Sequence, residues 1–214
     1  GSFFQQLYNT VDTIIAGQAC GTNALAAVGS TGNLTNLVVN FYVGLSTGAS
    51  VVIAQYYGAH NKGKIHQAVH TSYMLAIVSG IIMMLFGLFF SYQCLDAIGV
   101  PHDILNDASL YMKLYFLGMI PGAIYNIGSG ILRAVGDSKR PLYYLIICSI
   151  VNVVFDFVFV VILHKGIAGA AIATFIAQTV CAILVTLQLI FSKDVYQLIL
   201  SKIKFHLPVL KKIV

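Results

Sequence analysis

The amino-acid sequence predicts an all-α integral membrane protein, built as a bundle of six transmembrane helices. Three observations support this fold class: 58% of the 214 residues are hydrophobic, only 9% are charged, and long apolar runs recur along the chain. A soluble domain carries roughly 25% charged residues, so this chain cannot cover a globular surface with charge. Apolar runs of at least ~18 residues are long enough to cross the hydrocarbon core as helices. These features exclude a soluble fold.

The six predicted spans follow one another at short intervals. The first, residues 3–17, is short for a span, and we expect it to be the truncated end of a longer helix. The others cover about residues 34–57, 66–90, 108–132, 142–163 and 167–191. Pro121 lies inside the fourth span, where its ring and missing N–H predict a kink.

The last part of the chain differs from the spans. Residues 192–214 are basic and amphipathic, which is typical of a linker or interfacial helix at the membrane surface. The sequence therefore predicts a six-helix transmembrane lobe over residues 1–191 and a basic cytoplasmic segment over residues 192–214.

The basic residues predict how the helices are oriented. Ten of the 12 Lys and Arg residues fall in the loops after the second and fourth spans or in the last segment: Lys62, Lys64, Arg133, Lys139, Arg140, Lys193, Lys202, Lys204, Lys211 and Lys212. The positive-inside rule places these loops and the tail in the cytoplasm of a multi-pass protein of the cell membrane. The net charge of +5 is thus a topology signal and does not indicate nucleic-acid binding.

Two carboxylates fall inside predicted spans, Asp12 in the first and Asp156 in the fifth. A charged Asp at mid-span costs about 2.5–3.5 kcal/mol on insertion scales, and the apolar parts of the spans contain no Lys or Arg to offset it. Each Asp must therefore be protonated, bind a cation or face a water-filled cavity. Asp12 and Asp156 are accordingly the expected binding groups for a coupling proton or cation.

Other polar side chains recur at helical spacing. Gln5, Tyr8 and Asp12 share a face of the first span, and Ser149, Asn152 and Asp156 share a face of the fifth. The second span carries Asn33, Asn36, Asn40 and Thr47, and the sixth carries Thr174 and Gln178. These faces are candidates for the lining of one cavity. Asn, Ser and Thr in spans also simply hydrogen-bond between helices, at ~0.6 kcal/mol per contact, and for the three asparagines both roles stay open.

Glycine and cysteine patterns are more typical of packing than of chemistry. The pairs Gly44–Gly48 and Gly118–Gly122 have the spacing that permits close helix contact. The four cysteines, Cys20, Cys94, Cys148 and Cys181, have no metal-ligand spacing, which favours free, buried thiols. Cys20 and Cys94 both fall near the outer face, so a disulfide between them is geometrically feasible.

Histidines offer one candidate metal pair. His66 and His70 lie four residues apart, but no third ligand is evident, so an interfacial pair is favoured over a metal site. No metal is expected beyond Na⁺ as a coupling ion, and no organic cofactor is expected.

Several segments resemble a known family when they are read in order. They are LYNTVD (7–12), AG (16–17), ALAAVG (24–29), GLSTGA (44–49), AQYYGA (54–59), LRAVGDSKRP (132–141) and GAAIAT (169–174). This ordered set resembles the amino-terminal half of the multidrug and toxic compound extrusion (MATE) family. The resemblance implies one six-helix lobe of a twelve-helix, two-lobe antiporter that exports lipophilic or cationic small molecules in exchange for H⁺ or Na⁺.

The resemblance also implies site residues and partners. The coupling cation is expected at Asp12, Asn152, Asp156 and Thr174, with Ala170 lining the site. Gln5, Tyr8, Asn33, Asn36, Asn40 and Gln178, on the polar faces found above, are the further candidates for the cavity lining. The implied partners are drug-like or organic-cation substrates, the lipid bilayer and a second lobe, which would begin about where this sequence ends.

Two alternatives to drug export stay open. One is a flippase for lipid-linked precursors, which would need basic residues inside its cavity, and none are evident. The other is a non-transporting membrane subunit, a half-transporter. An enzyme is not expected, because the sequence shows no nucleophile–base pair and no metal cluster.

Overall fold

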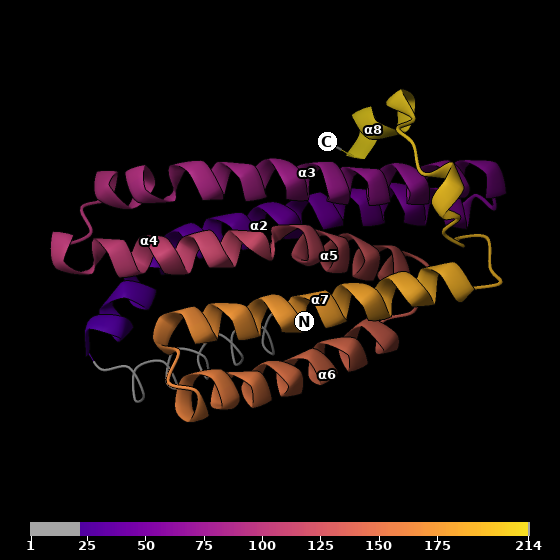
Figure 1. Cartoon of the computed structure of the whole chain (residues 1–214). Helices are drawn as coiled ribbons and strands as arrows, with labels where there is room; N and C mark the ends of the chain where they lie inside the picture. Colours follow the sequence, from indigo (N-terminus) through magenta and orange to yellow (C-terminus); the bar gives the residue numbers. More distant parts are fainter. Residues whose placement is uncertain (1–21, 214) are drawn as a thin grey trace.

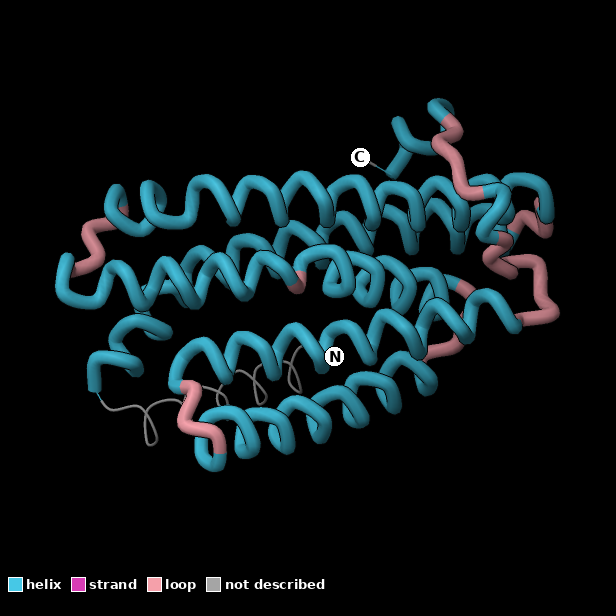
Figure 2. Tube along the Cα trace, viewed as in Figure 1, coloured by secondary structure: helices cyan, strands magenta, loops and turns pink. Residues whose placement is uncertain are grey.

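The computed structural model of the protein describes residues 22–213. The chain forms α2 (Thr22–Gly58), α3 (Lys62–Ala97), α4 (His102–Leu117), α5 (Met119–Ala134), α6 (Lys139–Asp156), the π-helix η1 (Phe157–Ile162) and α7 (Gly166–Phe191) (Figure 1). A 3-10 turn, η2 (Leu200–Lys202), and a short helix, α8 (Leu207–Ile213), follow. Only helices and loops are drawn for the described residues in Figure 2, which confirms the all-α prediction.

The predicted membrane spans reappear as long apolar helices. Four segments, Gly29–Gly58, Lys62–Ala97, Lys139–Ile162 and Gly166–Phe191, are long and apolar enough to cross a membrane, and α4 with α5 forms a fifth, bent span. These segments confirm the second to sixth predicted spans. The predicted first span, with Gln5, Tyr8 and Asp12, lies outside the described residues.

The fourth span is bent by 47° between α4 and α5. The sequence predicts the bend at Pro121, but the break lies three residues earlier, at Gly118, between the end of α4 and the start of α5. Pro121 instead occupies the first turn of α5, where its missing N–H costs no helical hydrogen bond. The Gly118 N–H donates to Tyr115 O at 2.9 Å, which closes α4 with a tight turn at a residue without a side chain.

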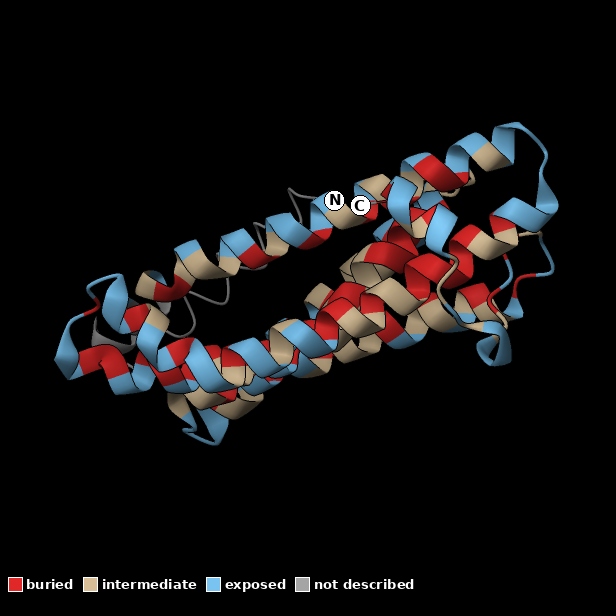
Figure 3. Ribbon diagram, turned by 90° about the horizontal axis from the view of Figure 1, so that it is seen from above, coloured by how far each residue is buried: buried red, intermediate tan, exposed pale blue. Residues whose placement is uncertain are grey.

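Within residues 22–213, the helices pack around α5 and α3, and α6 lies at the edge of this set. α2, α3 and α7 all pack against α5, whereas α6 contacts mainly α7. Buried residues gather where helices face one another, and the outward surfaces are exposed (Figure 3). Many exposed residues are large and apolar, such as Phe89 and Phe191, as expected for a surface that faces lipid.

Small residues allow the closest helix contacts. A Cβ added at Gly80 of α3 would lie 2.8 Å from Ile120 Cα of α5. The pair Gly118–Gly122 packs against the Gln178 side chain, as the spacing predicts. In the pair Gly44–Gly48, Gly48 makes such a contact, with Ile213 of α8, while a Cβ added at Gly44 would meet no atom of the described residues within 4 Å.

The two ends of the bundle differ in charge. The α2–α3 loop, the α5–α6 loop and the segment after α7 lie together at one end, opposite the α3–α4 and α6–α7 turns (Figure 1). This end, which we name the basic end, carries the ten basic residues that the sequence analysis grouped together. The structure thus confirms that they share one side of the bundle.

The segment after α7 is mostly irregular and is held by α3. The side chain of His70 is fully buried; its Nδ1–H donates to His66 O at 2.7 Å, and its Nε2 accepts from the Ile199 N–H at 3.0 Å. Thr71 Oγ1 accepts from the His206 N–H at 3.1 Å. The rings of His66 and His70 stack with centroids 4.0 Å apart. His70 and Thr71 therefore anchor this segment, and among the described residues no third metal ligand joins the histidine pair.

We expect His70→Ala to loosen residues 199–213. The substitution removes the buried hydrogen bond to the Ile199 N–H, which contributes about 1 kcal/mol, so amide exchange in this segment should accelerate by roughly fivefold. Hydrogen–deuterium exchange of the purified protein measures this effect. His60→Ala, an exposed histidine in the α2–α3 turn, is the control and should leave the exchange unchanged. Equal exchange in the His70 variant would show that the anchor lies elsewhere.

Candidate functional site

The buried face of α6 is polar over its second half. The buried residues of this helix are Pro141, Cys148, Asn152 and Asp156, at spacings that keep them on one stripe. Asn152 and Asp156 both have 0% exposure. Neither amide atom of Asn152 has a hydrogen-bond partner among residues 22–213. A carboxyl and an amide group thus lie side by side within a helix that is apolar on its other faces.

The backbone changes its geometry directly after Asp156. α6 ends there, and residues 157–162 form the π-helix η1, in which the Leu163 N–H donates to Val158 O at 2.9 Å. A π-turn widens the helix and shifts the residues before it relative to those after it, and such turns are frequent at functional sites. The candidate carboxylate therefore sits at a break in regular helix geometry.

The facing residues on α7 are also among the predicted ones. Cys148 of α6 and Cys181 of α7 have Cα atoms 5.9 Å apart, which fixes the register of this antiparallel pair. Two turns from Cys148 along α6 is Asp156, and two turns back from Cys181 along α7 is the Ala173–Thr174 region. Thr174 has 2% exposure, and its hydroxyl donates to Ala170 O at 3.1 Å. The pairing brings Asp156, Asn152, Thr174 and Ala170 to the same stretch of the α6–α7 seam.

The cysteines correct one expectation. Cys148 and Cys181 are joined as a disulfide, so the prediction of free thiols is wrong for this pair. Cys94 is free and half-buried, in agreement with the prediction. Cys20, the other half of the feasible Cys20–Cys94 bond, lies outside the described part of the chain.

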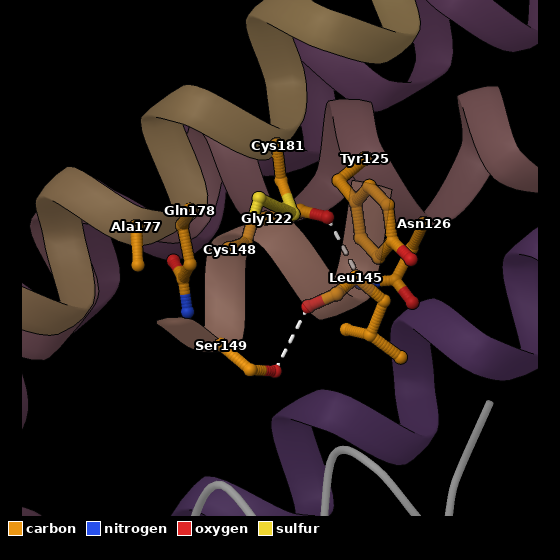
Figure 4. A pocket seen from close by; sticks show the side chains of 9 residues that line it. All are labelled: Gly122, Tyr125, Asn126, Leu145, Cys148, Ser149, Ala177, Gln178 and Cys181. Carbon is orange, nitrogen blue, oxygen red and sulfur yellow. Dashed lines mark hydrogen bonds between the residues drawn. A yellow bond between two sulfur atoms is a disulfide. The ribbon is translucent and has the colours of Figure 1, made fainter. Parts of the chain in front are cut away.

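A small cavity with several polar groups in a largely apolar wall adjoins the seam on the side of the basic end. Its volume is about 60 Å³. Gly122, Tyr125 and Asn126 of α5, Leu145, Cys148 and Ser149 of α6, and Ala177, Gln178 and Cys181 of α7 line it (Figure 4). Ser149 Oγ donates to Leu145 O at 2.8 Å, and Asn126 Nδ2 donates to Gly122 O at 2.9 Å.

Some predicted lining residues lie at this cavity and others do not. Gln178 lines it, whereas Asn33, Asn36 and Asn40 are exposed on α2 and do not contribute to its wall. Gln5, Tyr8 and Asp12 lie outside the described residues. The sequence analysis missed Tyr125 and Asn126, although an Asn in the middle of an apolar span was a usable signal.

Comparison with known proteins decides the family. A family model described as MatE matches residues 1–158 of the chain, well over half of its length. This chain belongs to the MATE family. The MATE assignment, made on motifs spread along the sequence, is thereby confirmed, and it places the chain among membrane transporters and not among enzymes.

The similar proteins are longer than this chain. The probable multidrug resistance protein YoeA of Bacillus subtilis (strain 168) is 29% identical over 177 residues, which are 81% of this chain and 38% of YoeA. The outward-facing structure of a multidrug resistance MATE transporter of the MOP superfamily is 28% identical, with a TM-score of 0.90, covering 100% of this chain and 47% of that one. The chain therefore spans less than half the length of these relatives and matches one half of the MATE fold.

A structure in a second conformation is equally similar to this chain. The structure described as the inward-facing conformation of a multidrug resistance MATE family transporter also gives a TM-score of 0.90 at 28% identity, covering 98% of this chain and 48% of that one. The fold of this half is therefore similar in structures described as facing opposite sides of the membrane.

Proposed function

We propose that this chain is one lobe of a secondary active exporter that expels lipophilic or cationic small molecules in exchange for H⁺ or Na⁺. The observation that carries the proposal is Asp156, which is fully buried in a membrane-spanning helix one turn from the buried Asn152. Such an intramembrane carboxylate is a functional group by default, because its charge must be neutralised. The similar proteins named for multidrug resistance support the export of drug-like substrates.

The proposed mechanism follows from the charge of Asp156 in its ionised and neutralised states. With Asp156 ionised, the seam attracts a cation, and oxygen atoms of carboxyl, amide and hydroxyl groups are the donors that a hard cation such as Na⁺ prefers. A proton or Na⁺ neutralises Asp156, so that the buried faces of α6 and α7 can pack closely and a cationic substrate loses its counter-charge. Coupling requires the ion and the substrate to favour different states, because equal preference shifts nothing. Asp12 is proposed as the partner carboxylate.

The lobe acts in this proposal as a rigid unit. Equal similarity to outward-facing and inward-facing structures supports rocking of one lobe against another, the usual basis of alternating access. The segment after residue 191 would lead to the second lobe. Its basic residues and the two basic loops support a cytoplasmic location for the basic end.

Efflux with independently varied gradients tests the proposal. Cells or proteoliposomes carrying the full reading frame that contains this chain should export a fluorescent organic cation. We expect export to follow either the pH gradient or the Na⁺ gradient and to stop when that gradient is collapsed. Export that persists without both gradients would contradict the proposal, and so would a failure to export any of a panel of lipophilic cations.

A further inference from the structure

The cavity between α5, α6 and α7 has the room and the hydrogen-bonding groups to hold water. Its volume of about 60 Å³ is several times the ~10–15 Å³ that one water molecule needs. Gln178 Oε1 is buried at its wall and makes no hydrogen bond within residues 22–213. Because Asn126 and Ser149 use their donors on backbone carbonyls, their oxygen atoms remain available as acceptors. A bound water needs two to four polar partners, and three helices supply them here.

The cavity lies between the candidate cation site and the basic end. On α6, Ser149 is one turn from Asn152 and two turns from Asp156, on the side toward Lys139. On α7, Gln178 is one turn from Thr174, again toward the basic end. Polar groups therefore continue along both walls of the seam in one direction, from Asp156 into the cavity.

A further polar group continues the path. The Tyr125 hydroxyl at the cavity wall donates to Pro141 O at 3.1 Å. Pro141 belongs to the first turn of α6, next to Arg140 at the basic end. The polar groups thus extend from the buried carboxylate almost to the charged end of the bundle. On the other side of α7, the wide groove lined by Thr179 and Ile183 is almost wholly apolar.

We propose that this cavity is a hydrated passage through which the coupling cation moves between Asp156 and the basic end. Water bound by Gln178, Asn126 and Ser149 solvates the cation on its way, which an apolar seam cannot do. The inference rests on the proposed function, because it needs a cation that binds at Asp156. It adds a route and names Ser149, Gln178, Asn126 and Tyr125 as its lining.

Ser149→Leu tests the passage with a matched control. The added side chain fills the cavity from α6, and Ala177→Val fills it from α7. Thr179→Leu is the control: its hydroxyl, like that of Ser149, donates to its own helix at 2.8 Å, but it faces the apolar groove outside the seam. Ser149→Ala removes the hydroxyl without filling the space.

The full-length variants are reconstituted in proteoliposomes, with a pH dye or ²²Na⁺ reporting cation movement during substrate export. We expect Ser149→Leu and Ala177→Val to slow coupled cation movement by at least about tenfold, because a dehydrated cation cannot enter an apolar seam. Thr179→Leu should stay within about twofold of wild type, as for a substitution outside the feature tested. Ser149→Ala removes one polar partner of the bound water without closing the cavity, so we expect a smaller loss than in Ser149→Leu. Substrate binding measured by titration should be unchanged in all four and shows that they are folded.

The outcomes separate the two proposals. Suppose that wild-type export is coupled to an ion gradient, but Ser149→Leu and Ala177→Val both move the cation at rates within twofold of Thr179→Leu. This result overturns the passage and leaves the proposed function standing. Wild-type export that ignores both ion gradients overturns the proposed function itself. A tenfold loss in both filled variants, with Thr179→Leu intact, supports the passage.

Discussion

Asp156→Asn is expected to reduce export to below about one tenth of the wild-type rate. The amide keeps the shape of the side chain but cannot carry the charge that a proton or Na⁺ neutralises. Loss of one member of a buried charge pair costs about 2–5 kcal/mol, which corresponds to roughly 30-fold or more in affinity for the coupling ion. Initial rates of drug efflux, with pH and Na⁺ varied independently, measure the effect. The remaining export should no longer respond to either gradient.

Asp96→Asn is the matched control for this substitution. Asp96 is exposed in the last turn of α3, at the end of the bundle opposite the basic end, so the same chemical change there should leave export intact. Membrane insertion of both variants should equal that of wild type, because removing a charge from a span makes insertion easier. Unchanged export by Asp156→Asn would refute the assignment of this residue to the coupling site.

Gly80→Ala is expected to destabilise the bundle by about 1–3 kcal/mol, the usual effect of overpacking. The new methyl group would lie 2.8 Å from Ile120 Cα, and a backbone atom in a packed helix cannot move aside as a side-chain tip can. α3 and α5 must therefore separate, which loosens the centre of the bundle. Thermal unfolding in detergent should show a melting temperature lower by several degrees.

The same substitution at Gly63 should have a different effect. Gly63 lies in the first turn of α3, where the nearest atom to an added Cβ is Asn61 Oδ1 at 3.9 Å. Alanine has a higher helix propensity than glycine by up to ~1 kcal/mol, so Gly63→Ala should leave the melting temperature unchanged or raise it slightly. A similar loss of stability in both variants would show that helix contact at Gly80 is not the cause.

The membrane spans were readily predicted, because a run of about 20 apolar residues has the length of a membrane-crossing helix and is too apolar for a soluble surface. Their ends were harder to place: α2 already includes Thr22, well before the predicted start near residue 34, since polar residues continue a helix beyond its apolar part. The close contact at Gly80 was missed, because the chain holds 19 glycines and spacing alone does not say which of them face a neighbour.

The candidate site was predicted in part, for a similar reason. Periodicity places Ser149, Asn152 and Asp156 on one stripe of a single helix, and the structure has the last two of them buried. The contribution of α5 to the cavity, through Tyr125 and Asn126, depends on which helices are neighbours. The Cys148–Cys181 pair likewise depends on the register of α6 against α7. Neither property is encoded in the spacing along one helix.

The anchoring of the C-terminal segment has a mechanical consequence. His70 and Thr71 fasten residues 199–206 to α3, and Lys212 places its ammonium group 5.5 Å from the centre of the Tyr56 ring on α2. A linker to any following domain would therefore be free of the bundle only after Ile213, not after Phe191. A domain joined there would rotate about a point fixed on the surface of α2 and α3. This attachment would limit the range of its orientations relative to the bundle.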